Sequence, residues 1–149
     1  MSPHRFYPSG VPRLNHVALS VPSSLLESEG RADLLRYFDE VLGFEELPTM
    51  TLEGRRVVLS CVHWDQFIFL VSDDSPMSCP HGDHYGFGVG SLEELVGARD
   101  RALEFAATDA RLELDDLRVD DHGMVKIHSI YLSYLLPMRC ELQYWEFAK

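Results

Sequence analysis

The sequence predicts an α+β protein built from two β-α-β-β-β modules. One seven-residue pattern occurs twice, as NHVALSV at 15–21 and as DHYGFGV at 83–89. Both copies alternate bulky with small or polar residues, which is the period of a half-buried β-strand. Each copy is followed by a helical pattern and then by three strand patterns. A duplicated module explains this order better than chance similarity between the two halves.

The repeated strands also present two histidines at the same position. His16 shares its strand face with small residues, and His84 shares its face with Gly86 and Gly88. Small neighbours leave room beside each imidazole, while the opposite faces carry bulky residues that can pack under a helix. A functional site between the two modules is therefore expected.

The first module is predicted at 14–72, after an irregular N-terminal arm at 1–13 that contains three prolines. Two serines after the first strand can cap a helix, and apolar residues at helical spacing lead up to Gly43, a typical helix stop. The expected elements are a strand at 14–21, a helix around 34–42, and strands at 44–51, 56–62 and 66–71.

The second module is predicted at 84–149, after a linker at 73–83 that is rich in Ser, Pro, Gly and Asp. Ser91 and Glu94 form a capping-box pattern at the start of its helix. The apolar face of that helix is expected to bury Leu92, Leu95, Val96, Leu103 and Phe105. The expected strands lie at 85–90, 111–119, 126–135 and 139–147, with a turn at 120–123.

The charge and cysteine content of the chain indicate which binding partners and which cellular compartment to expect. A formal net charge of −11 would repel nucleic acids and anionic membranes. The three cysteines form no CxxC pair, and their odd number disfavours a disulfide framework. No stretch is typical of a signal peptide or a membrane span. These features favour a soluble cytoplasmic protein with a small-molecule ligand.

The chain resembles the vicinal oxygen chelate superfamily, which includes glyoxalase I, extradiol dioxygenases, fosfomycin-resistance enzymes and bleomycin-binding proteins. The resemblance spans 14–147 and rests on NHVALSV, DHYGFGV, RYFDEVLGFEE at 36–46 and SIYLSYLLPMRCEL at 129–142. It implies that the two βαβββ modules form a curled mixed sheet around a metal-binding cleft. It also implies a homodimer, with the cleft formed within one chain or across two chains.

By this resemblance, the metal ligands are His16, His84 and Glu141. The fourth family position falls on Phe69, which cannot bind a metal, and Gln66 could replace it only if the strand shifted by one residue. Two histidines and one carboxylate form the facial triad of non-haem Fe(II) oxygenases, which leaves positions for substrate and O2. Fe(II) is therefore favoured, and Mn²⁺, Zn²⁺ or Ni²⁺ could use the same ligands.

The spacing of His122, Tyr131 and Glu141 resembles the extradiol dioxygenase signature. By that resemblance, Tyr131 would hydrogen-bond a substrate oxygen and His122 would transfer protons. The signature expects an Asp-Pro-x-Gly type turn, whereas this chain has Leu-Leu-Pro-Met at 135–138. A solvated turn residue is an equally good interpretation of His122, and Tyr131 could be part of the cleft wall.

Three functions follow from the resemblance. The first is a metal-dependent enzyme, specifically an extradiol-type dioxygenase acting on a small catechol-like diol. The second is a metal-dependent isomerase, lyase or thiol transferase of glyoxalase type. The third is a binding protein without catalysis, comparable to the bleomycin-resistance proteins.

Overall fold

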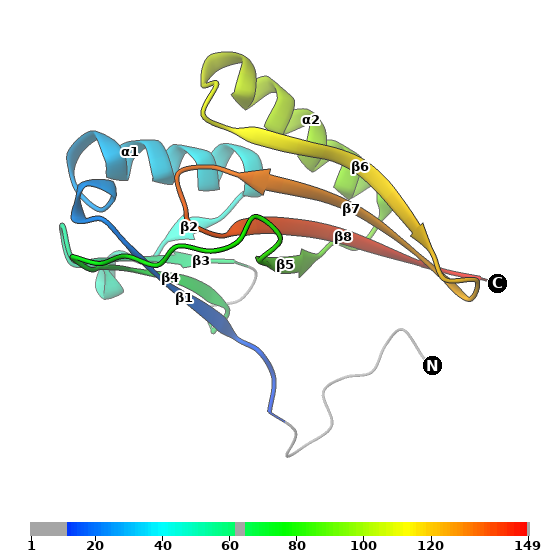
Figure 1. Cartoon of the computed structure of the whole chain (residues 1–149), viewed down its shortest axis with the longest axis horizontal. Coiled ribbons are helices and arrows are strands. Elements are labelled where there is room, and N and C mark those ends of the chain that lie inside the picture. Colours follow the sequence, from blue (N-terminus) through cyan, green and yellow to red (C-terminus); the bar gives the residue numbers. More distant parts are fainter. Residues whose placement is uncertain (1–11, 62–64, 149) are drawn as a thin grey trace.

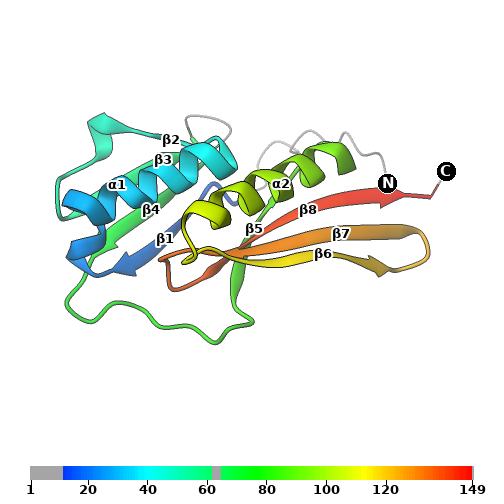
Figure 2. The ribbon, with the colours of Figure 1, turned by 90° about the horizontal axis from the view of Figure 1, so that it is seen from above.

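The computed structural model describes residues 12–61 and 65–148. It contains two four-stranded mixed sheets, with strand orders β1-β4-β3-β2 and β5-β8-β7-β6. Both helices lie on the same side of the two sheets (Figures 1 and 2). The predicted α+β architecture with two βαβββ halves is confirmed. Most of the predicted arm at 1–13 lies outside the described residues.

The first sheet places β1 next to β4 in parallel and closes with antiparallel β3 and β2. The helix α1 continues into a π-helical turn at Phe38–Leu42 and ends at Gly43, whose φ of 71° suits glycine. The elements of this half are β1 (His16–Val21), α1 (Ser28–Tyr37), β2 (Glu45–Glu46), β3 (Arg56–Ser60) and β4 (Phe67–Ser72).

The second sheet repeats this arrangement with longer strands. Ser91 accepts a hydrogen bond from the Glu94 backbone, as the capping pattern predicts. The last three strands extend past the end of β5 as a long ribbon (Figure 1). The elements are β5 (His84–Gly88), α2 (Leu92–Thr108), β6 (Glu113–Asp121), β7 (Val125–Ser133) and β8 (Arg139–Phe147).

Strand register shows how closely the two halves correspond. In the first half, Ala18 lies opposite Phe69, two residues after His16. In the second half, Gly86 lies opposite Glu141, two residues after His84. Phe69 and Glu141 therefore occupy equivalent positions in the two modules.

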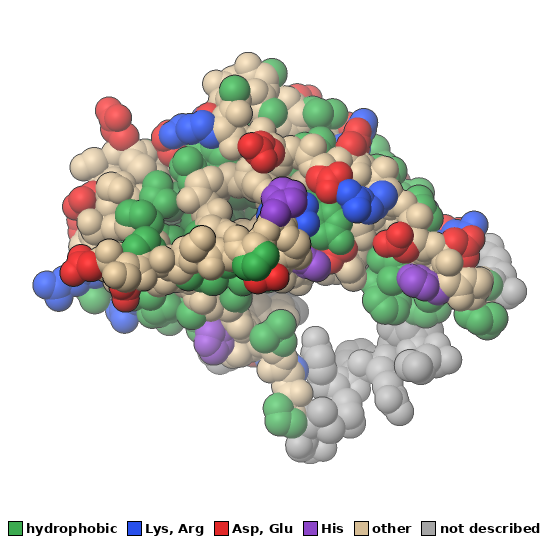
Figure 3. Space-filling view, viewed as in Figure 1, with side chains coloured by type: hydrophobic (Ala, Val, Ile, Leu, Met, Phe, Trp, Pro, Cys, Tyr) green, Lys and Arg blue, Asp and Glu red, His purple; other side chains and the backbone are tan. Residues whose placement is uncertain are grey.

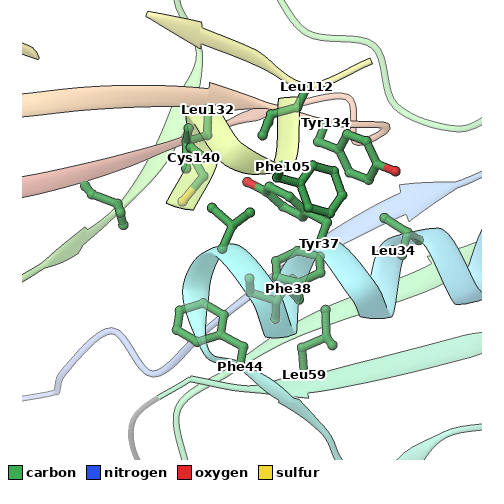
Figure 4. Close-up of a cluster of buried hydrophobic side chains, with 14 of the residues drawn as sticks. Leu34, Tyr37, Phe38, Phe44, Leu59, Phe105, Leu112, Leu132, Tyr134 and Cys140 are labelled. Carbon is green, nitrogen blue, oxygen red and sulfur yellow. The ribbon is translucent and has the colours of Figure 1, made fainter. Parts of the chain in front are cut away.

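An aromatic cluster of Tyr37, Phe105 and Tyr134 joins the two halves (Figure 4). The ring of Tyr37 on α1 lies 5.9 Å from Phe105 on α2 and 4.8 Å from Tyr134, measured between centroids. All three side chains are buried. Their packing is edge-on or tilted, which aromatic quadrupoles favour. The aromatic cluster fixes the two modules against each other.

Three local predictions are wrong. The strand expected at 44–51 has only two paired residues, because Pro48 begins a short 3-10 helix. The helix α2 buries Ala98 and Ala102, whereas Leu92 and Leu103 are 37% and 44% exposed. The sixth strand continues to Asp121, into the turn expected at 120–123.

No helix in the described ranges is long and apolar enough to cross a membrane. The three cysteines are free thiols, and Cys140 is buried. Acidic side chains are spread over the face shown in Figure 3, with Lys and Arg side chains between them.

Candidate metal centre

His84 and Glu141 meet across adjacent strands. The Nε2 atom of His84 lies 3.2 Å from Oε2 of Glu141. Glu141 is 5% exposed, whereas His84 is at the surface. A Cβ atom on Gly86 would lie 3.5 Å from the same carboxylate oxygen, so the glycine leaves this oxygen open to the groove beside it. The sequence prediction of space beside the histidine therefore agrees with this structure.

The hydrogen bond on the other ring nitrogen determines what the His84–Glu141 pair can bind. His84 Nδ1 lies 2.9 Å from the Gly82 carbonyl oxygen, which can only accept, so Nδ1 carries the hydrogen. In a neutral ring, Nε2 then directs a lone pair toward a carboxylate oxygen. Two acceptors at this distance need a cation between them, either a metal ion or a second proton. The nitrogen and oxygen donors fit a divalent metal ion.

The carboxylate of Glu141 is held in its ionised form. Burial alone would raise its pKa, but donors on Gln143, Ser129 and Tyr131, together with His84, outweigh burial and lower the pKa of Glu141. The amide oxygen of Gln143 accepts from the Trp145 indole at 2.7 Å, which turns its amide nitrogen toward Glu141. A fixed, charged carboxylate is what a metal ligand requires.

The ring of Tyr131 contacts His84 of the His84–Glu141 pair and also two arginines, Arg139 and Arg118. Its ring meets His84 edge-on at 5.2 Å, and the guanidinium carbons of Arg139 and Arg118 lie 4.7 and 5.3 Å from its centroid. Burial and the hydrogen bond to Glu141 raise the pKa of Tyr131, although both arginines oppose this. The phenol therefore remains a hydrogen-bond donor near neutral pH.

His16 lies at the exposed start of β1, stacked on Phe67 with centroids 4.9 Å apart. It lines the same open groove as His84 and Glu141, whose volume is about 1680 Å³. However, no three His, Cys, Asp or Glu side chains within 12–61 and 65–148 are close enough to hold one ion. The chain alone thus assembles two of the three predicted ligands.

The remaining predicted residues lie elsewhere. His122 is exposed in the turn between β6 and β7, at the opposite end of the ribbon from Tyr131. It lines neither the groove nor a second, smaller pocket that includes Tyr131. The β1–β4 register keeps Phe69 on the face of His16, so Gln66 is not shifted into the ligand position.

Sequence reasoning placed Tyr131 at the candidate site but missed Arg139 and Gln143. These two residues flank Glu141 at a spacing of two along β8, so strand alternation places all three on one face. Strand alternation on either side of Glu141 could have found both residues in the sequence.

Comparison with solved structures identifies the fold. The chain aligns with a glyoxalase family protein from Bacillus anthracis at 20% identity and TM-score 0.59, covering 91% of this chain and 97% of that one. It aligns with the fosfomycin resistance protein FosX from Listeria monocytogenes at 17% identity and TM-score 0.60, covering 93% of this chain and 95% of that one. Lactoylglutathione lyase from Agrobacterium tumefaciens aligns at 16% identity and TM-score 0.60, and the alignment covers 93% of this chain and 96% of that one.

No protein-family model and no curated protein matches the sequence. At these identities, the structural matches establish the fold alone. It is the fold of the vicinal oxygen chelate superfamily, as the resemblance predicts.

Proposed function

We propose that this chain, which has the vicinal oxygen chelate fold, is a divalent-metal-dependent enzyme for a small substrate with two adjacent oxygens. The observation that carries the proposal is the His84–Glu141 pair, in which the imidazole Nε2 lies 3.2 Å from a carboxylate oxygen while Nδ1 lies 2.9 Å from the Gly82 carbonyl oxygen. His84, Glu141 and His16 would hold the ion. A bound divalent cation would act as a Lewis acid toward the substrate oxygens.

The protein's own groups have separate tasks in this proposal. Glu141 and His84 bind from a rigid sheet, and Gln143 and Ser129 keep the carboxylate oriented. Tyr131 stays protonated, and its single O–H would turn from Glu141 to a substrate oxygen when the substrate binds. His122 is left out, because its turn lies outside the groove.

For the reaction class, we propose an extradiol-type dioxygenase acting on a catechol-like diol, with Fe(II) as the metal. The support is the equivalence of Phe69 with Glu141 in the two sheets. Because Phe69 cannot bind a metal, the proposed ligand set is two histidines and one carboxylate, which would leave positions for substrate and O2. The three free thiols agree with a reducing cytoplasm.

A second candidate is a metal-dependent isomerase, lyase or thiol transferase that uses Mn²⁺, Zn²⁺ or Ni²⁺. It is favoured by the structural similarity to a fosfomycin resistance protein and a lactoylglutathione lyase. Metal analysis of anaerobically purified protein, followed by measurement of oxygen uptake with a panel of catechols, distinguishes the two candidate reactions. Iron with catechol-dependent oxygen uptake supports the dioxygenase, and turnover without air supports the second candidate.

Replacing Glu141 by Ala tests whether the protein is a metalloenzyme at all. Removing a direct ligand is expected to weaken metal binding by more than the ~10–100-fold typical of residues that only orient ligands. Activity should be lost with the metal. The measurement is metal content together with titration against a competing chelator.

The matched control is Glu146→Ala. Glu146 lies on the same strand, but it is exposed and hydrogen-bonds His128 at 2.8 Å. It should retain metal and activity. If Glu141→Ala keeps its metal, or binds small molecules as well as the unmodified chain without any metal, the non-catalytic binding protein becomes the better interpretation.

A further inference from the structure

Two contacts hold the ring of His16 at the start of β1. Its Nδ1 atom lies 2.8 Å from Oδ1 of Asn15, the residue immediately before it. Its face stacks on Phe67, with the ring planes 8° apart and the centroids 4.9 Å apart. All three residues line the open groove that also contains His84 and Glu141. The imidazole of His16 therefore has a defined plane and a defined direction within the groove.

The backbone ties Asn15 to the same place. The Phe67 amide donates to the Asn15 carbonyl oxygen at 3.0 Å, next to the first residue pair of β1 and β4. Asn15 is partly buried, whereas His16 is exposed. The residue that contacts His16 through its side chain is thus bonded through its backbone to the residue that stacks on His16.

The contact with Asn15 determines which nitrogen of His16 can bind a cation. A side-chain amide oxygen can only accept, so Nδ1 of His16 carries the hydrogen and donates it to Asn15. In the neutral ring, Nε2 then holds the lone pair. Within 12–61 and 65–148, no residue hydrogen-bonds this Nε2 atom. The free donor atom of His16 is therefore Nε2, as it is in His84.

The two halves of the repeat orient their histidines by different means. In the second half, Nδ1 of His84 lies 2.9 Å from the backbone carbonyl oxygen of Gly82. Asp83 occupies the position of Asn15 in the repeated pattern, but its side chain is exposed and makes no bond to the His84 ring in the part of the chain that the structure describes. One substitution can therefore remove the partner of the His16 ring, whereas the partner of the His84 ring belongs to the backbone.

We propose that Asn15 is a positioning residue of the candidate metal centre, because it fixes His16 in the tautomer whose Nε2 can bind a divalent ion. The proposal rests on the proposed function for the role of His16 as a ligand. A histidine that binds a metal donates its other ring N–H to an oxygen, and this bond fixes the ring and makes it a stronger ligand. Asn15 and His16 are neighbours in one chain, so their pairing does not depend on which copy of the chain completes the site.

The first test needs neither metal nor a variant of Asn15. Long-range nitrogen–proton correlation NMR of the metal-free full chain shows which ring nitrogen carries the hydrogen, at a pH of about 8, where an ordinary imidazole is neutral. The His16 signals are identified by their absence in His16→Ala. The hydrogen is expected on Nδ1, and a hydrogen fixed on Nε2 overturns the proposal.

Two substitutions of Asn15 then separate the acceptor from the size of the side chain. Asn15→Leu removes the acceptor, so neither tautomer of His16 is fixed, and Zn²⁺ should bind about 10–100-fold more weakly, the range for residues that orient metal ligands. Asn15→Asp retains an oxygen acceptor, so it should keep the hydrogen on Nδ1 and bind Zn²⁺ at least as tightly as the unmodified chain. Zn²⁺ alone is the probe, because it has no redox chemistry, and its affinity is measured by competition with a chelator.

The matched control is Asp83→Leu, at the equivalent position of the second half. It should leave the tautomer of His84 unchanged, because the Gly82 carbonyl oxygen remains in place. Its effect on Zn²⁺ affinity should be a few-fold at most, since it removes only the screened attraction of one exposed charge.

Equal Zn²⁺ affinity of Asn15→Leu and the unmodified chain overturns the positioning role. A loss of affinity in Asn15→Asp as large as in Asn15→Leu also overturns it, because the amide nitrogen of Asn15 rather than its oxygen would then face the ring. Failure of the proposed function has a different signature. The unmodified chain then binds no Zn²⁺ although NMR still finds the hydrogen of His16 on Nδ1, which overturns the ligand role of His16 and with it the role of Asn15 toward a metal.

Discussion

At the scale of single residues, Asp109 is a second place where a buried carboxylate is fixed by its neighbours. Arg111 hydrogen-bonds it at 2.6 and 2.8 Å, the Tyr134 hydroxyl donates to it at 2.7 Å, and Arg36 lies 3.3 Å away. Arg111 also reaches Asp33 on α1 at 2.7 Å. This group of side chains connects α1 to the second module at the surface end of the aromatic cluster.

The hydrogen bonds from Arg111, followed by that from Tyr134, lower the pKa of Asp109 well below its usual value, against the opposing effect of burial. A carboxyl with a lowered folded-state pKa stabilises the fold above its unfolded pKa of about 3.9 and loses this contribution as the pH falls below it. We therefore expect Asp109→Asn to melt lower than the unmodified chain at pH 7, with a smaller difference in acid. Thermal unfolding at both pH values measures this.

The control for this residue is Asp116→Asn. Asp116 pairs with Arg99 at the surface, where its pKa is lowered to about 2 by hydrogen bonds from Arg99 and the Leu117 backbone. Exposed ion pairs contribute little to stability, so this variant should melt close to the unmodified chain at pH 7. Equal melting temperatures for the two variants would show that the hydrogen bonds of Asp109 stabilise the fold no more than an exposed ion pair does.

Strand alternation and the repeated pattern pointed to His84 in the sequence, and the family resemblance added Glu141 as a candidate ligand. The sequence could not show that Gly82 fixes the tautomer of His84, because that hydrogen bond depends on how the linker turns into β5. Nor could it reveal that the Nε of Arg139 has no hydrogen-bond partner within the described part of the chain, because the surroundings of this arginine come from other strands.

At the scale of elements, the helix α2 shows where pattern reasoning failed. The prediction that Leu95 and Phe105 are buried is confirmed, but it also chose Leu92 and Leu103, whereas α2 buries Ala98 and Ala102 instead. Small residues allow the helix to approach closely, and the ring of Phe105 fills the space against Tyr37 and Tyr134. Hydrophobicity alone does not specify which side of a helix faces a partner when both sides carry leucines.

Two alanine substitutions test this interface. Phe105→Ala removes a side chain that is 3% exposed and should lower the free energy of unfolding by about 3–5 kcal/mol. Leu103→Ala, on the exposed side of the same helix, should change it by no more than about 0.5 kcal/mol. Chemical denaturation measures both, and a large loss for Leu103→Ala would contradict the assigned helix face.

At the scale of the whole molecule, the two sheets of one chain remain separate, with β1 and β5 as edge strands of their sheets. Exposed apolar residues at the far end of the β6–β8 ribbon include Val119, Met124, Trp145 and Phe147. We expect a homodimer in which one copy supplies His84 and Glu141 and the other supplies His16.

Mixed dimers test this arrangement. Copies carrying His16→Ala and Glu141→Ala should each lack the complete site, but together they should recover about one quarter of the unmodified metal sites, because half of the dimers are mixed and each holds one intact site. The measurement is metal content after co-expression with two affinity tags. Two differently tagged Glu141→Ala copies serve as the control, and absence of recovery in confirmed mixed dimers would favour a cleft within one chain.

The sequence alone predicted the two-module architecture and the two histidine-bearing strands, because strand alternation and duplication are local properties of the chain. The family resemblance supplied Glu141 as the third candidate ligand. It also placed Phe69 at the fourth ligand position, which the register of β1 and β4 agrees with. Only the tertiary structure decided which groups meet. It paired His84 with Glu141 and separated His122 from Tyr131, because distances between strands depend on packing that local pattern does not encode.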